Sequence, residues 1–135
     1  MALAISTAPA RPLVLIVDSN DDLVSTLSAV LQLSGFAAAS AATAAKAETL
    51  FEELHPEAVV MELRLPGGVD ALQLCKRMRE LGGPSPLIVA QTSWLTKEIR
   101  HQADTAGFDQ CLMKPGEPCA LIRLLATTQT RQSAQ

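Results

Sequence analysis

Five short runs rich in apolar residues alternate with five stretches of helical periodicity, and this alternation limits the fold more than any other feature. The apolar runs lie at 13–17, 36–40, 58–61, 86–90 and 109–113. Each run has the length of one strand, and the stretches between them place apolar residues at three- and four-residue spacing. Parallel neighbours need crossover connections, so the pattern predicts one doubly wound α/β domain with a five-stranded parallel sheet.

Local signals mark several helix ends. Asn20 or Asp21 can cap the first helix and Thr43 the second, while Pro118 suits the first turn of the last helix. Gly35 and Gly107 follow the first and fourth helices as stop signals. We therefore expect a flexible arm over 1–11, the domain over 12–127 and a flexible tail over 128–135.

Composition narrows the class of protein. The chain has 135 residues and a net charge of −3, so it lacks the basic footprint of a nucleic-acid-binding protein. It carries neither a bilayer-length apolar run nor a secretory signal, and we expect a cytoplasmic protein. Cys75, Cys111 and Cys119 show no metal-ligand spacing and are predicted to be reduced packing residues. The basic cluster of Lys76, Arg77 and Arg79 is predicted to be the exposed face of a helix.

Polar residues follow the predicted strands and should gather at one edge of the sheet, because parallel strands all end on the same side. The residues are Asp18 and Ser19, Glu62, Thr92 and Ser93, and Lys114 with Pro115. Carboxylates can hold a hard divalent cation, and a hydroxyl with an ammonium group can neutralise phosphoryl oxygens. The combination predicts a site of the phosphoryl-transfer type.

Four motifs in order carry a resemblance to a known family. They are LIVDSNDD, VVMELRLPGG, VAQTSW and GFDQCLMKPGEP. Together they resemble the CheY-like receiver domains of two-component response regulators, over about residues 12–126. The resemblance implies the strand order 2-1-3-4-5 of the flavodoxin type, which would place Asp18 opposite Glu62.

The resemblance also implies a metal site, which this sequence only partly retains. Asp18 matches the first of two adjacent acids that hold magnesium in such domains, but Ser19 replaces the second. Glu62 stands at the aspartate that accepts the phosphoryl group, and Arg64 at the residue whose backbone carbonyl completes the metal shell. We therefore expect a degenerate, weak magnesium site at Asp18, Glu62 and Arg64, and no other cofactor.

The remaining positions are mixed. Thr92 and Lys114 match the hydroxyl and the lysine that contact the phosphoryl group, and the resemblance implies a cis peptide before Pro115. Cys111 stands where the family often carries an aromatic switch residue. The run GGVDAL is one residue longer than the family pattern.

These departures predict a receiver-like module that no longer depends on phosphorylation. The longer Glu62 side chain should form a fixed network with Thr92 and Lys114 and imitate the phosphorylated form in part. The module would not be an enzyme, and it would bind a histidine kinase, an output domain or another signalling protein. The resemblance also implies a homodimer through about 94–126. The alternative is a working phosphoacceptor that receives its phosphoryl group from a histidine kinase on Asp18 or Glu62.

Simpler interpretations remain open for single residues. Glu62 could be a solvated carboxylate paired with Arg64 or Lys114, and Asp18 could cap the first helix or turn. Thr92 and Ser93 could likewise cap the fourth helix. Trp94, the single tryptophan, could cover the mouth of the pocket, join a partner contact or pack half-buried.

Overall fold

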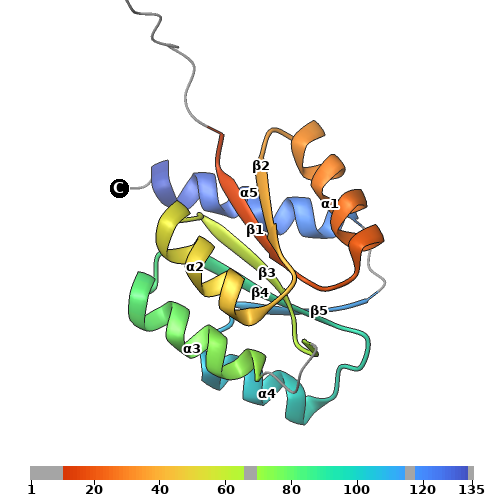
Figure 1. Ribbon diagram of the computed structural model, residues 1–135, viewed down its shortest axis with the longest axis vertical. Coiled ribbons are helices and arrows are strands. Elements are labelled where there is room, and N and C mark those ends of the chain that lie inside the picture. Colours follow the sequence, from red (N-terminus) through yellow and green to blue (C-terminus); the bar gives the residue numbers. More distant parts are fainter. Residues whose placement is uncertain (1–10, 66–69, 115–117, 134–135) are drawn as a thin grey trace, which may run out of the picture.

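The computed structural model describes residues 11–65, 70–114 and 118–133. Within them, one sheet holds five parallel strands in the order β2-β1-β3-β4-β5 (Figure 1). The strands are β1 (Leu13–Val17), β2 (Ala37–Ala41), β3 (Ala58–Glu62), β4 (Leu87–Thr92) and β5 (Gln110–Met113). This sheet confirms the predicted fold class and strand order.

Helices cover both faces of the sheet. They are α1 (Asp21–Leu33), α2 (Ala44–Leu54), α3 (Ala71–Gly82), α4 (Lys97–Ala106) and α5 (Pro118–Ser133). Helices α1 and α5 pack with one apolar cluster of the sheet, and α2, α3 and α4 pack with the other (Figure 1). No helix in the described ranges is both long enough and apolar enough to cross a membrane.

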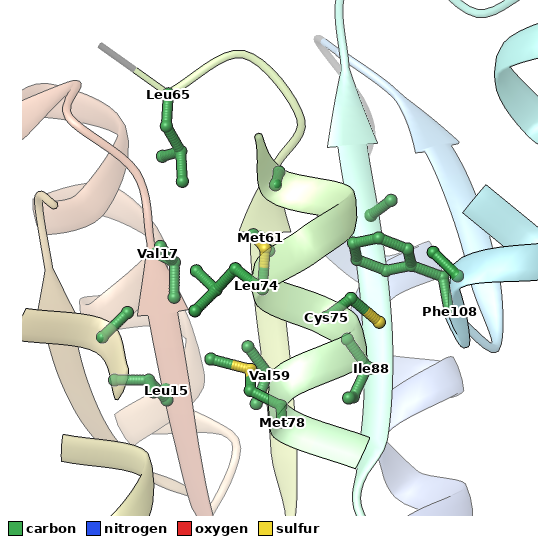
Figure 2. Close-up of a cluster of buried hydrophobic side chains, with 14 of the residues drawn as sticks. Leu15, Val17, Val59, Met61, Leu65, Leu74, Cys75, Met78, Ile88 and Phe108 are labelled. Carbon is green, nitrogen blue, oxygen red and sulfur yellow. The ribbon is translucent and has the colours of Figure 1, made fainter. Parts of the chain in front are cut away.

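The larger cluster lies between the sheet and α3 (Figure 2). Side chains from β1 and β3 meet α3 there, and the labelled members are Leu15, Val17, Val59, Met61, Leu74, Cys75 and Met78. Cys75 and Cys111 are buried free thiols, as expected for packing residues, whereas the side chain of Cys119 lies outside the description. Burial raises the pKa of the Cys75 thiol from 9.0 to about 11.

Most helix ends follow the signals in the sequence. Asn20 caps α1 by accepting a hydrogen bond from the Leu23 amide at 3.1 Å, and Thr43 caps α2 in the same way. Helix α4, however, is capped by Thr96, whose hydroxyl accepts from the Ile99 amide at 3.1 Å. Neither Thr92 nor Ser93 is therefore the cap of α4.

Two expectations differ from the structure. Helix α5 continues through Ser133, past the point where the flexible tail was expected to begin, because the segment after 127 contains no glycine or proline to stop it. Arg79 is not simply exposed, since its guanidinium donates to the carbonyls of Gly83, Pro86 and Gly107. It also pairs with Asp109 at 2.8 Å.

Candidate functional site

Strands β1, β3 and β5 end close to one another and bring three charged side chains together. Strands β1 and β3 are direct neighbours, with Val17 paired to Met61, so Asp18 and Glu62 both lie at the carboxyl edge. The Lys114 amide donates to the Thr92 carbonyl at 2.8 Å and so extends the pairing of β5 with β4 by one residue. The sheet therefore fixes the backbone at which each of these side chains begins.

The Lys114 ammonium contacts both carboxylates. Its Nζ lies 2.5 Å from Asp18 Oδ2 and 2.9 Å from Glu62 Oε1. The side chains of Lys114 and Glu62 are each 12% exposed and that of Asp18 is 5% exposed. The contact predicted between Glu62 and Lys114 is thus present, and it is shielded from water on most sides.

The other oxygen of each carboxylate accepts a backbone hydrogen bond. Asp18 Oδ1 accepts from the Asn20 amide at 2.9 Å, and Glu62 Oε2 accepts from the Arg64 amide at 3.0 Å. Asp18 therefore supports a turn, as the simpler interpretation proposed, and binds Lys114 as well. Residue type alone did not reveal these amide donors, because every residue except proline carries one.

The two carboxylates keep Lys114 charged. Burial disfavours the ammonium form, but the hydrogen bonds and negative charges of Asp18 and Glu62 outweigh burial and raise the pKa of Lys114 above its usual value. The ammonium thus stays protonated at neutral pH, and the cluster carries two negative charges and one positive charge.

Thr92 does not join this cluster in the predicted way. It is 1% exposed, and its hydroxyl accepts from the Trp94 amide at 3.3 Å and donates to the Trp94 carbonyl at 3.4 Å. Within the described residues, no hydrogen bond joins the Thr92 hydroxyl to Glu62 or Lys114. The expected three-residue network is therefore wrong in this part. The physical reason is local, because the chain turns away from the sheet after β4 and the Trp94 amide needs a nearby acceptor.

The remaining predicted residues lie around the rim. Ser19, Arg64 and Ser93 are exposed, and Cys111 is 5% exposed in the core. Trp94 is 64% exposed, so the half-buried packing role considered for it does not hold. The peptide before Pro115 and the longer loop after Pro66 lie outside the described residues.

The residues present do not fit magnesium, which the resemblance implied. Magnesium requires near-octahedral oxygen ligands, whereas each carboxylate oxygen of Asp18 and Glu62 already accepts from an ammonium or an amide group. Ser19 supplies no charge in place of the missing acid. In the described part of the chain, no three acidic, histidine or cysteine side chains gather in a metal-binding arrangement.

A hollow of about 200 Å³ lies beside Thr92, between the start of α3 and α4. Its lining includes Leu63, Ala71, Leu72 and Ile99. Sequence reasoning did not find this hollow, because its walls come from residues far apart in the chain that each have an ordinary packing pattern.

Comparison with known proteins identifies relatives over most of the chain. A family model described as the response regulator receiver domain matches residues 14–126. A 14.6 kDa protein of Leptolyngbya boryana, encoded in the sodA1 3′ region, is 33% identical over 113 residues, which cover 83% of this chain and 86% of that protein. The DNA-binding response regulator MtrA of Mycolicibacterium smegmatis is 30% identical over 113 residues, covering 83% of this chain. The match spans 48% of MtrA, about half of its length.

Solved structures show the same fold. A CheY-like receiver domain protein from Methanospirillum hungatei JF-1 aligns with a TM-score of 0.85 at 20% identity, over 93% of this chain and all of that one. A response regulator from Chloroflexus aurantiacus J-10-fl aligns with a TM-score of 0.80 at 28% identity, over 88% of this chain and 98% of that one.

Proposed function

This chain belongs to the response regulator receiver domain family of two-component systems, and from this premise we propose that it is a receiver that works without phosphorylation. It would signal through protein contacts, with one conformation held by the ion pairs among Asp18, Glu62 and Lys114. The module would have no enzymatic activity of its own and would work in the cytoplasm.

The contact between Lys114 and Glu62 carries this proposal. A carboxylate that accepts a phosphoryl group must offer a free lone pair to phosphorus, but both oxygens of Glu62 already accept hydrogen bonds. The ammonium lies where it would have to neutralise an incoming phosphoryl group, and it is already bound. Glu62 is also one methylene longer than the family's aspartate, so its oxygens lie nearer to Lys114. These features favour a permanent contact over a phosphorylation cycle.

Exposed apolar side chains support the idea of action by protein contact. Trp94 is 64% exposed and Met113 is 52% exposed, and both follow the end of the sheet where α4 and β5 begin or finish. Large apolar groups at the surface favour association with other proteins. The partner would be a histidine kinase, an output domain or another signalling protein, or a second copy through about 94–126. The absence of direct nucleic-acid binding remains a prediction from the net charge of −3, although MtrA is named as DNA-binding.

The test is incubation with acetyl phosphate and magnesium, followed by intact-mass measurement. We expect no phosphoryl adduct on the wild-type chain. A matched variant with Ser19→Asp and Glu62→Asp restores the family's acids and should gain a magnesium-dependent adduct on residue 62. This variant shows that the assay can detect phosphorylation in the same fold.

A wild-type adduct that disappears in Glu62→Ala or in Asp18→Asn would contradict the proposal. It would establish the alternative function, in which the chain is a working phosphoacceptor of a histidine kinase.

A further inference from the structure

The Lys114 ammonium lies between two carboxylates that belong to different strands. Asp18 follows β1, Glu62 ends β3 and Lys114 follows β5, so one side chain connects the ends of three strands. We propose that this ammonium is the built-in cation of the site, taking over the charge neutralisation that a divalent metal would otherwise provide. The inference rests on the proposed function and adds to it how the site is kept in one state.

Coordination chemistry supports this assignment. A divalent ion such as magnesium needs about six oxygen ligands. Asp18 and Glu62 each donate one oxygen to Lys114 and use the other to accept a backbone amide. A metal ion would have to break these hydrogen bonds before it gained its first carboxylate ligand.

Charge supports it as well. The ammonium leaves the two carboxylates with a net charge of −1, and a divalent ion placed beside it would be repelled by a neighbouring positive charge. Side-chain exposures of 12% or less mean that water screens this repulsion poorly. The lysine and a metal ion are therefore competitors for the same pair of carboxylates.

Competition predicts that removal of the lysine creates a metal dependence that the wild-type chain lacks. Lys114→Ala leaves two neighbouring, mostly buried carboxylates without their cation, which destabilises the fold. Magnesium or calcium should then restore stability in a saturable way. The half-saturating magnesium concentration should be at least about tenfold lower than in the wild type, because a repelling charge has been removed.

The measurement is the thermal unfolding midpoint in potassium chloride and in magnesium chloride at equal ionic strength. We expect the wild type and Lys114→Arg, which keeps the positive charge, to unfold at the same temperature in both salts. Lys114→Ala should be stabilised by magnesium, and the added substitution Asp18→Asn should remove that effect. Equal behaviour of Lys114→Ala and the wild type in the two salts would overturn the inference.

A second measurement covers the case in which Lys114→Ala does not fold. Titration of the wild-type chain with Mn²⁺, followed by water proton relaxation, should show no saturable binding that depends on Asp18. Binding that Asp18→Asn abolishes would overturn the inference. If such a chain still formed no phosphoryl adduct, the proposed function would stand, and the two ideas can thus fail separately.

Discussion

At the scale of single residues, one methylene group distinguishes Glu62 from the aspartate of the family. The sequence allowed us to predict that Glu62 would reach Lys114, because the strand order fixes which residues share an edge. It did not show that Lys114 would contact Asp18 as well, or that Thr92 would turn to Trp94. Both outcomes depend on side-chain torsions and on which backbone amides lack a partner, and residue spacing does not determine either.

Two residues predict how stability depends on pH. The folded state raises the pKa of Cys75 to about 11 and raises that of Lys114 above its usual value. Both groups therefore hold their protons more tightly in the folded state than in the unfolded chain. Their stabilisation is complete below pH 9 and is lost as the pH rises through the folded-state values. For Cys75 the shift corresponds to roughly 2–3 kcal/mol.

Cys75→Ala tests this prediction. Urea unfolding of the wild type should show a steep loss of stability between pH 9 and pH 11. The variant starts less stable because it loses a buried sulfur, but its stability should fall less steeply over the same range. Identical slopes for the two proteins would show that the Cys75 thiol does not contribute.

At the scale of elements, Arg79 joins α3 to the turns that precede β4 and β5. Its guanidinium donates to the carbonyls of Gly83, Pro86 and Gly107 and pairs with Asp109. A side chain at Gly107 would begin 2.9 Å from Arg79 Cγ, and the φ of Gly107 is +115°. Because Arg79 is held by several hydrogen bonds, it cannot easily move aside.

Gly107→Ala should therefore destabilise the fold more than Gly35→Ala does. Gly35 has a comparable φ of +96°, but a Cβ there would meet nothing within 4 Å. We expect Gly35→Ala to cost about 1–2 kcal/mol from backbone strain alone. Gly107→Ala should cost at least about 1 kcal/mol more, because of overpacking against Arg79. Chemical denaturation of both variants measures the difference, and equal losses would count against the role of Arg79.

Local sequence signals predicted most elements but not all of their limits. The β2 run, FAAAS with the following Ala41, has poor strand propensity, yet it forms a strand because it pairs with β1 from Leu13↔Ala37 to Val17↔Ala41. The cap of α4 was missed because Thr92, Ser93 and Thr96 are all capable of capping. The backbone path after β4 selects Thr96, and that path depends on the tertiary structure.

At the scale of the whole molecule, the alternation of strands and helices was enough to predict the architecture. Parallel strands require crossovers, and the resemblance to receiver domains supplied the strand order, which the structure confirms. What could not be predicted was the state of the site, since that depends on how three side chains from three strand ends share their hydrogen bonds. The fold is thus that of a receiver, and the departures are concentrated at the edge where receivers carry out their chemistry.

A double-mutant cycle on Glu62 and Lys114 tests most directly whether this edge is permanently closed by an ion pair. The free energy of unfolding is measured for the wild type, Glu62→Gln, Lys114→Met and the double variant. We predict a favourable coupling energy of about 1–3 kcal/mol between the two side chains in metal-free buffer. A coupling energy below about 0.5 kcal/mol would show that the two changes are independent, and it would contradict a fixed contact between Glu62 and Lys114.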